Sequence, residues 1–386
     1  MITTPTKDSL SIWIEKEKAA LRIINAASNL ILDNSVELVL FRRKLIDQTI
    51  TDVIGHHEYA REFAQIQIDV ILSAEIAEAI QSLNPSPSRI DIGILAKQWN
   101  EEGSSFDDLQ DFLKQKLERH LEGSDFTLEP KDVVLYGFGR IGRLAARILS
   151  EQIGKGEQLR LKAIVVRKGG DDDLEKRASL LRKDSVHGPF SGTVTVNNEK
   201  NQFIINGNTV QIIYASHPSE VDYTQYGIEN ALVIDNMGIW KTREDLSQHL
   251  QAKGATQVLL TAPASGDVTN VVYGVNHDEL EKLENETIFS GASCTTNAIA
   301  PVIKLIEDNY GIEDGHIETV HAYTNDQNLI DNFHKKGRRG RSAPLNMVLT
   351  STGAAKAVVK IFPHLKGKFT ANAVRVPTPN VSLAIL

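Results

Sequence analysis

The chain contains a single cysteine, Cys294, and its surroundings are those of a candidate nucleophile. It lies in the run Gly291-Ala292-Ser293-Cys294-Thr295-Thr296-Asn297-Ala298, directly before an apolar segment, 299–306, that is typical of a helix. A thiol at a helix N-terminus is close to the positive end of the helix dipole and to free amides, which favour the nucleophilic thiolate. Buried packing without chemistry is the alternative for a lone thiol, and the hydroxyl residues alone would indicate only a helix cap.

A second candidate for chemistry is the glycine-rich run Gly137-Phe138-Gly139-Arg140-Ile141-Gly142. It follows an apolar run at 133–136, typical of a buried strand, and precedes a helical pattern at 144–152, which is the context that the G-x-G-x-x-G fingerprint requires. The first glycine permits the tight turn, the second lets the backbone approach a pyrophosphate, and the third lets helix and strand pack closely. We therefore predict dinucleotide binding, with an empty strand-to-helix turn as the alternative.

The choice between NAD and NADP is expected at the end of the next strand, 161–166. An acidic residue there would bind the ribose 2′-hydroxyl and reject a 2′-phosphate. This chain has Arg167-Lys168-Gly169-Gly170 at that place, followed by Asp171-Asp172-Asp173. The two cations favour tolerance of or preference for NADP, whereas a shift of the loop by three residues would bring an aspartate to the ribose. The cofactor is therefore predicted as NAD or NADP.

The run from Ala292 to Asn297 resembles the active-site signature of phosphorylating glyceraldehyde-3-phosphate dehydrogenase. Other stretches that resemble this family follow in the family's order: Gly137 to Gly142, Asp184 to Gly188, Val275-Asn276, His321 to Gln327, Ser351 to Val358, and Arg375 to Ser382. The resemblance extends from about Lys131 to the last residue and leaves the first 130 residues uncovered. The N-terminal extension resembles that of the long bacterial forms of the enzyme.

The resemblance implies that Cys294 is the nucleophile and that His321, 27 residues later, is the base that activates it. An imidazolium stabilises a neighbouring thiolate, and the imidazole can later take the proton of a thiohemiacetal hydroxyl. Hydride transfer to the nicotinamide then leaves a thioester, which inorganic phosphate converts to an acyl phosphate. The implied activity is oxidation of D-glyceraldehyde 3-phosphate to 1,3-bisphosphoglycerate in glycolysis, or the reverse in gluconeogenesis.

The resemblance also implies residues for two anions, the substrate phosphate and inorganic phosphate. Thr324 and Arg375 would bind the substrate phosphate, Ser293, Thr352 and Gly353 the inorganic one, and Arg339 would reach between them, with Thr295 in the same substrate site. The residues expected to bind the cofactor are Gly137, Gly139, Arg140, Ile141, Gly142, Arg167, Lys168 and Thr261. No metal site is expected. The basic run 335–341 is interpreted as part of the anion site and of a tetramer interface rather than as a nucleic-acid patch.

Three further departures from the family accompany the missing acidic residue. Tyr214-Ala215-Ser216-His217-Pro218 replaces an Arg-Asp-Pro turn near the adenosine, and Ala298 replaces a frequent second cysteine. The sequence also stops at Leu386, within an apolar run that resembles a strand of the catalytic sheet. We therefore expect a fragment of a longer polypeptide, truncated at its C-terminus, which could itself be inactive.

The elements that must position these residues change in character near residue 130. Only four of the 26 glycines, Gly55, Gly93, Gly103 and Gly123, lie in the first 130 residues, so this part is expected to be mostly helical. Later, short β-branched runs alternate with helical patterns, which predicts a mostly parallel, doubly wound sheet. The predicted fold is α/β: an α-helical extension over 1–127, a Rossmann-type cofactor domain over 128–292 and an incomplete α+β catalytic domain over 293–386.

Within the extension we predict helices around 9–27, 35–63, 66–83 and 106–121, the last behind a capping box at Ser105-x-x-Asp108. Asn84-Pro85-Ser86-Pro87 predicts a turn or linker. His56-His57-Glu58 is interpreted as ordinary helix surface rather than a metal site, because adjacent helical residues point in different directions. The role of the extension stays open between oligomerisation, regulation and support of the cofactor domain.

Composition excludes several function classes. The chain of 386 residues has 42 Lys plus Arg against 50 Asp plus Glu, a net charge of −8, with 41% hydrophobic and 24% charged residues. No run approaches the ~18 apolar residues of a membrane-spanning helix, and the acidity disfavours nucleic acid as a partner. One cysteine excludes internal disulfides, and the N-terminus lacks a secretory pattern, so a cytoplasmic protein is expected. The family resemblance implies a homo-oligomer, a tetramer.

Two other functions are left open at this stage. One is erythrose-4-phosphate dehydrogenase, a sister enzyme whose segment after the histidine differs from Tyr323-Thr324-Asn325. The other is a non-catalytic fragment that binds a dinucleotide or a protein.

Overall fold

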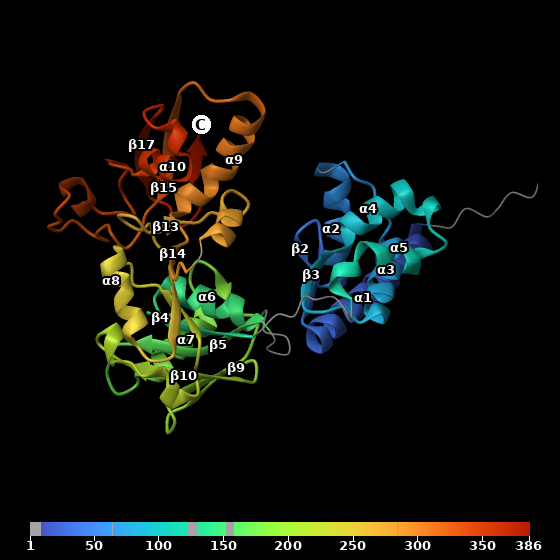
Figure 1. The fold of residues 1–386 in the computed structure, drawn as a ribbon, viewed down its shortest axis with the longest axis horizontal. Coiled ribbons are helices and arrows are strands. Elements are labelled where there is room, and N and C mark those ends of the chain that lie inside the picture. Colours follow the sequence, from blue (N-terminus) through green and yellow to red (C-terminus); the bar gives the residue numbers. More distant parts are fainter. Residues whose placement is uncertain (1–8, 64, 122–129, 152–157, 284) are drawn as a thin grey trace, which may run out of the picture. The chain divides into compact units, whose positions relative to one another are not determined.

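The computed structural model describes residues 9–63, 65–121, 130–151, 158–283 and 285–386 (Figure 1). The chain divides into two compact units, the first made of residues 1–131 and 148–160 and the second of residues 132–147 and 161–386. The predicted domain boundaries at 127/128 and 292/293 stay predictions. Among the residues that the structure describes, no helix has the length and apolarity needed to cross a membrane.

The first unit is mostly helical and also contains a small sheet. Its helices are α1 (Ser9–Asn34), α2 (Ile50–Phe63), α3 (Val70–Leu83), α4 (Ile92–Glu102) and α5 (Leu109–Lys116), and its strands are β1 (Val36–Leu40), β2 (Arg43–Lys44) and β3 (Ser88–Asp91). The strand order is β2-β1-β3, with β1 parallel to β3 and antiparallel to β2. One core joins these elements, and α1 contributes Ala20, Ile23 and Leu30 to it.

The prediction of one helix over 35–63 is wrong in its first half, where β1 and β2 lie. A short, fully buried apolar strand has the same sequence appearance as a buried helical segment. Phe41 and Arg42 have positive φ angles of 46° and 68° and form the turn between the strands. The carboxylate of Asp91, at the end of β3, accepts their backbone N–H groups at 2.9 and 3.0 Å. This turn therefore depends on a residue about 50 positions away.

Two other local predictions for the first unit need correction. Asp108, not Ser105, is the N-cap of α5, and its side chain accepts the N–H of Asp111 at 2.8 Å. His57 is 5% exposed, so the interpretation of its surroundings as helix surface is wrong. Its ring nitrogens lie 2.8 Å from the carbonyl of Val53 and 2.9 Å from the hydroxyl of Ser73. The predicted turn after residue 83 is confirmed, because Asn84 ends α3 in the left-handed conformation.

A nine-stranded sheet dominates the second unit. Its elements in chain order are β4 (Lys131–Tyr136), α6 (Arg140–Glu151), β5 (Leu159–Val166), α7 (Asp173–Arg182), β8 (Val194–Asn197), β9 (Gln202–Ile205), β10 (Asn208–Tyr214), β11 (Ala231–Asp235), α8 (Arg243–Ser247), β12 (Ala255–Leu260), β13 (Thr269–Asn270) and β14 (Ile288–Ser290). A two-stranded ribbon of β6 (Lys183–Asp184) and β7 (Gly188–Pro189) follows α7.

The strand order confirms the predicted Rossmann-type domain. The sheet has the order β13-β14-β12-β11-β4-β5-β10-β9-β8. The chain therefore moves outward from β4 through β5 to β10 and then crosses to β11, β12 and β14, which is the doubly wound order for dinucleotide binding. The long hairpin of β8 and β9 extends this sheet with antiparallel strands.

The last part of the second unit is a four-stranded sheet with two helices. Its elements are α9 (Cys294–Tyr310), β15 (Gly315–Ala322), β16 (Val348–Thr350), α10 (Ala354–Ile361), β17 (Phe369–Val376) and β18 (Leu383–Ile385), and Figure 1 shows α9 and α10 beside β15 and β17. The strand order is β16-β17-β15-β18, with β15 and β17 parallel. Ile299, Ile303, Val358 and Leu365 share the core between helices and sheet. This mixed sheet is the predicted α+β part.

Candidate active site

Cys294 is the first residue of α9, as its sequence context predicts. Ser293 is the N-cap, and its Oγ accepts the N–H of Thr296 at 3.0 Å. The amide of Asn297 donates to the carbonyl of Gly291 at 2.7 Å, which fixes the loop before the helix. Cys294 itself is exposed. The sulfur is thus held at the positive end of a 17-residue helix and remains accessible to a substrate.

His321, on β15, faces this sulfur. Its Nε2 lies 3.4 Å from Sγ of Cys294. The hydrogen bond to His321 lowers the pKa of the Cys294 thiol, and its effect exceeds the opposing effect of burial. The same contact with Cys294 raises the pKa of His321, again against burial. The two shifts have opposite signs, so the pair favours a thiolate beside an imidazolium.

Arg375 holds the other side of the imidazole. The parallel pairing of β15 and β17 places His321 opposite Arg375. One guanidinium nitrogen lies 2.8 Å from Nδ1 of His321 and 2.8 Å from the carbonyl of Ala322, to which it donates. Nδ1 is 2.6 Å from the same carbonyl. Arg375 therefore fixes the ring orientation that presents Nε2 to Cys294.

One cavity of about 390 Å³ brings together six of the residues predicted from the sequence. They are Arg140, Ile141, Cys294, Thr295, His321 and Thr324. Arg140 and Ile141 begin the helix after the glycine-rich loop, and the others belong to the last part of the chain. The cavity therefore connects the predicted cofactor loop with the predicted nucleophile.

The other predicted anion ligands lie outside this cavity. Arg339 is 8% exposed and donates to Oγ1 of Thr350 at 2.8 and 3.0 Å and to the carboxylate of Asp326. It lines a separate cavity of about 560 Å³ with Lys336 and Arg338. Thr352 and Gly353 precede α10, and Oγ1 of Thr352 accepts the N–H of Ala354 at 3.2 Å.

The glycine-rich loop has the backbone geometry that its fingerprint predicts. Gly137 has a φ of +93°, a conformation that other residues rarely adopt. A Cβ at Gly142 would lie 2.3 Å from the carbonyl oxygen of Gly137, so only glycine permits this approach of helix and strand. Around Gly139 a Cβ would meet no atom within 4 Å, which leaves open space in front of the loop.

The predicted cofactor residues after β5 and β12 lie at the carboxyl ends of these strands. Arg167 and Lys168 follow β5 directly and are exposed. Thr261 follows β12, and its hydroxyl donates to the carbonyl of Asp235 at 3.0 Å. Carboxyl ends of parallel strands form the edge at which doubly wound sheets bind ligands.

Several residues of the cavity were not singled out by sequence analysis. His187, Thr319, Asn380 and Ser382 line it as well. The hydroxyl of Ser382 accepts the N–H of Ala322 at 3.1 Å and so supports the residue after His321. Three of the four, His187, Asn380 and Ser382, lie within stretches that carry the family resemblance, which was the available signal. Among the described residues, no group of three or more His, Cys, Asp or Glu side chains is arranged to hold a metal ion.

Comparisons with known proteins identify both parts of the second unit. Residues 131–243 match the NAD binding domain of glyceraldehyde 3-phosphate dehydrogenase, and residues 293–386 match its C-terminal domain. A glyceraldehyde-3-phosphate dehydrogenase-like protein of Pseudomonas aeruginosa is 52% identical over 357 residues, which cover 92% of this chain and 77% of the relative. That match must include much of the first unit.

Two other relatives match a shorter part of the chain. Glyceraldehyde-3-phosphate dehydrogenase of Zymomonas mobilis is 42% identical over 252 residues, 65% of this chain and 71% of the relative. Glyceraldehyde-3-phosphate dehydrogenase 1 of Bacillus subtilis is 41% identical over 254 residues, 66% of this chain and 72% of the relative.

Proposed function

The chain belongs to the glyceraldehyde-3-phosphate dehydrogenase family, and from this premise we propose that Cys294 and His321 catalyse the phosphorylating oxidation of D-glyceraldehyde 3-phosphate. The observation that carries the proposal is the contact of 3.4 Å between the sulfur and Nε2 at the start of α9. The opposite pKa shifts of the two groups support an ion pair that is ready to attack an aldehyde.

The chemistry of the protein's own groups follows from this pair. The thiolate adds to the aldehyde carbon, and the carbonyl oxygen takes a proton from the imidazolium to give a thiohemiacetal. His321 then accepts the hydroxyl proton as the C–O double bond forms again. NAD, when bound, supplies an acceptor for the hydride that leaves this carbon. Inorganic phosphate attacks the resulting thioester, the carbon–sulfur bond breaks, and Cys294 is released as a thiolate with 1,3-bisphosphoglycerate as product.

The glycine-rich loop fits a dinucleotide. Its close approach at Gly142 and the open space at Gly139 leave the amides at the start of α6 free to bind a pyrophosphate. Gly137, Gly139, Arg140, Ile141 and Gly142 would hold this part of the cofactor. Thr261, at the end of β12, would contact it from the neighbouring strand.

Tolerance of or preference for NADP is supported by the pairing of Asp173. Its carboxylate accepts a hydrogen bond from Nε of Arg177 at 2.8 Å and contributes to the raised pKa of Tyr214. Asp173 is therefore occupied, whereas Arg167 and Lys168 are exposed at the strand end. These cations would meet a 2′-phosphate, and the exposed Asp171 and Asp172 are the carboxylates left to meet a 2′-hydroxyl.

The predicted anion ligands are proposed with the roles that the family resemblance implies. Thr324 and Arg375 would bind the substrate phosphate near Cys294, and Thr295 would be a further ligand of the substrate or phosphate. Ser293, Thr352 and Gly353 would bind inorganic phosphate, and Arg339 would act between the two. Arg339 is already neutralised by Asp326, so this role requires that its ion pair is rearranged or shared.

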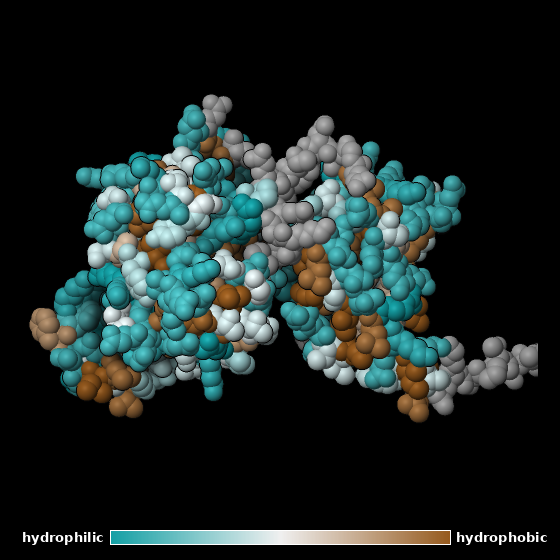
Figure 2. Space-filling view, turned by 90° about the horizontal axis from the view of Figure 1, so that it is seen from below, coloured by the Kyte–Doolittle hydropathy of each residue, from teal (hydrophilic) through white to brown (hydrophobic). Residues whose placement is uncertain are grey.

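We also propose that the protein is a homotetramer in the cytoplasm and that it works in glycolysis or gluconeogenesis. Leu329, Ile330, Phe333, Leu345 and Met347 are all at least 72% exposed. Such a concentration of exposed apolar side chains in one segment is typical of subunit contacts. Figure 2 shows apolar side chains interrupting the polar surface. A single unpaired thiol is consistent with a reducing compartment.

Turnover with and without phosphate tests the function. Reduction of NAD and of NADP is measured with glyceraldehyde 3-phosphate and, in parallel, with erythrose 4-phosphate. We expect glyceraldehyde 3-phosphate to be the better substrate and turnover to depend on phosphate. Turnover that is independent of phosphate would contradict the acyl-phosphate mechanism, and a preference for the four-carbon sugar would move the chain to the sister activity.

A further inference from the structure

A buried polar pair lies at the carboxyl end of β11, inside the nine-stranded sheet. His249 and Asp235 are both 0% exposed, and Nε2 of His249 lies 3.1 Å from Oδ2 of Asp235. Among the described residues, Nδ1 of His249 has no hydrogen-bond partner. Neither residue lines the Cys294 cavity. A charge without water is costly unless a partner compensates it, so each member of the pair depends on the other.

Asp235 connects this pair to the residues around the glycine-rich loop. Its Oδ1 accepts the N–H of Met237 at 2.6 Å. Its carbonyl accepts the N–H and the hydroxyl of Thr261 at 2.9 and 3.0 Å. The sulfur of Met237 packs so closely on Gly137 that a Cβ there would lie 2.7 Å from it. The carboxylate of Asp235 thus fixes the turn after β11 beside the loop, and its backbone carbonyl joins the end of β11 to the end of β12.

His249 connects the same pair to a set of aromatic rings. Its ring contacts Tyr136, which immediately precedes Gly137, with centroids 4.8 Å apart. It also contacts Trp240 at 5.5 Å, and Trp240 in turn contacts His217 at 6.1 Å. All three contacts are edge-on. His217 belongs to the turn that the family resemblance places near the adenosine.

The phenol of Tyr136 is affected by the same carboxylate. Burial raises the pKa of Tyr136 to about 12, and the negative charge of Asp235 adds to this effect. The N–H of Asn236 donates to the carbonyl of Tyr136 at 2.8 Å, so β4 and β11 are tied together at the same level. The ring of His249 therefore contacts the end of β4, and Asp235, at the end of β11, is hydrogen bonded to the end of β12.

We propose that His249 and Asp235 are a positioning pair for NAD: they hold the ends of β4, β11 and β12 in the geometry that binds the cofactor, without touching it. This inference requires the part of the proposed function that concerns NAD binding, and it does not require the proposed reaction at Cys294. A packing role alone would be served by apolar side chains of similar volume, which avoid the desolvation of two polar groups. The pair is therefore expected to influence cofactor affinity more than the reactivity of Cys294.

The test measures NAD binding to the full chain directly, by titration of tryptophan fluorescence, together with the rate at which iodoacetamide alkylates Cys294. We expect His249→Leu to raise the Kd for NAD about tenfold, as outer partners of binding sites do. The alkylation rate without NAD should stay within twofold of the wild type. His249→Gln, which keeps a nitrogen donor for Asp235, should restore much of the affinity. His364→Gln, at a histidine with a 57% exposed side chain, is the matched control.

The possible outcomes separate the two ideas. If the wild-type chain does not bind NAD, the cofactor assignment itself is wrong. If it binds and His249→Leu has the same Kd, or if Kd and alkylation change together, the positioning role is refuted. Should His249→Leu fail to fold, Asp235→Asn takes its place, since it keeps an acceptor for Met237 and removes the charge that faces His249. Unchanged affinity in Asp235→Asn would equally overturn the proposal.

Discussion

His57 in the first unit and His321 in the second differ in the partners of their ring nitrogens and in how accessible those partners are. In the first unit, both ring nitrogens of His57 are hydrogen bonded, to Val53 and to Ser73, and the ring is buried. In the second unit, Nε2 of His321 faces the sulfur of Cys294 at the wall of a cavity. The partner of His57 cannot be exchanged, whereas a substrate can reach Cys294. A reactive site thus differs from a stabilising one in the accessibility of the partner, and not in the type of residue.

The electrostatic consequences differ in sign as well. Burial lowers the pKa of His57, and the opposing effects of the Val53 carbonyl and of the Asp69 carboxylate are smaller. Contact with Cys294 raises the pKa of His321 in spite of burial. The neutral form is therefore favoured in the first unit and the charged form in the second.

Among variants that test this difference between the two units, Cys294→Ser is expected to have the largest effect. Removing the thiolate should lower dehydrogenase turnover by about 10⁴-fold or more, with NAD affinity unchanged within twofold. His57→Leu, the counterpart in the first unit, should leave turnover at 25 °C within twofold of the wild type. Steady-state assays and NAD titrations of both variants measure these quantities. Turnover retained in Cys294→Ser would refute the nucleophile.

The next effect concerns the base. His321→Asn should raise the pKa of Cys294 towards the ~8.5 of a free thiol and lower turnover by about 10²–10⁴-fold. The pH dependence of alkylation by iodoacetamide reports this pKa, because the chain has one cysteine. His316→Asn is a matched control on the same strand, at a side chain that is 48% exposed. An alkylation midpoint that stays in place in His321→Asn would contradict the ion pair.

The second unit is easier to predict from its sequence than the first, for a physical reason. The strands of a doubly wound sheet are short, β-branched and separated by helices and glycine turns, so β4, β5 and β10 to β12 are visible one by one. The sheet of the first unit joins Val36–Leu40 to Ser88–Asp91, which are about 50 positions apart, and its turn is held by Asp91. No local pattern contains that information.

The candidate site shows the same limit. The glycines of the loop and the position of Cys294 at a helix start follow from local sequence. The contact of Arg375 with His321 depends on the parallel register of β15 and β17, which pairs residues 54 positions apart. The burial of His249 beside Asp235 likewise follows from packing between elements. Such contacts need the tertiary structure, and family resemblance supplies residue identities but not these partners.

A smaller effect is expected in the first unit, on the free energy of unfolding. His57→Leu leaves the hydroxyl of Ser73 without its partner, so it should lower the free energy of unfolding by about 1–3 kcal/mol. The double variant His57→Leu, Ser73→Ala should recover part of this loss, because both polar groups are then gone. Urea unfolding followed by the fluorescence of Trp13 and Trp99, both in the first unit, measures it. Unchanged stability in His57→Leu would show that the buried hydrogen bonds are not stabilising.

The same histidine predicts a pH dependence of known sign. Its folded-state pKa is lowered by burial from the ordinary value of 6.5, so the folded state binds fewer protons than the unfolded state near that pH. The stability that His57 contributes is therefore complete above about pH 6.5 and declines as the pH falls below it. Wild type should lose stability between pH 7 and 5, and His57→Leu should lose less. Equal slopes for the two proteins would contradict this assignment.

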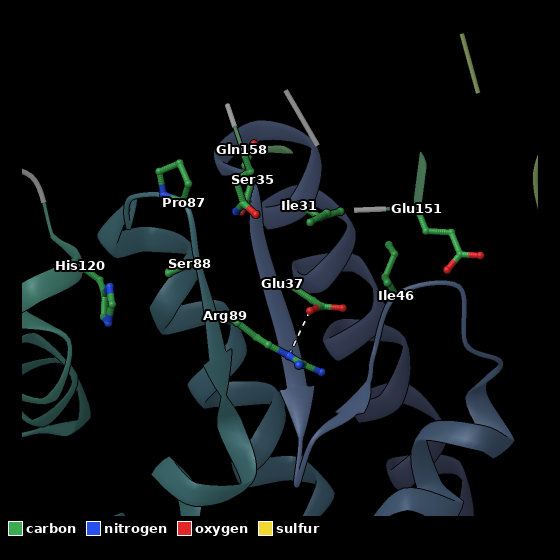
Figure 3. Close-up of a pocket in the computed structure, with 10 residues that line it drawn as sticks. All are labelled: Ile31, Ser35, Glu37, Ile46, Pro87, Ser88, Arg89, His120, Glu151 and Gln158. Carbon is green, nitrogen blue, oxygen red and sulfur yellow. Dashed lines mark hydrogen bonds and ion pairs between the residues drawn. The ribbon is translucent and has the colours of Figure 1, made fainter. Parts of the chain in front are cut away.

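The smallest effect is expected from a partly exposed ion pair that lines a cavity of about 360 Å³ in the first unit (Figure 3). Nε of Arg89 on β3 lies 3.1 Å from a carboxylate oxygen of Glu37 on β1, and the Arg89 side chain is 52% exposed. Water screens such a pair, so Arg89→Met should change the free energy of unfolding by less than about 1 kcal/mol. The difference should shrink further when salt is raised, because the Debye length falls to about 3 Å at 1 M. A loss that survives high salt would mean that Arg89 acts through packing of its stem instead. Charged residues that line a cavity thus mark an active site only when, as at Cys294, a reactive atom among them remains accessible.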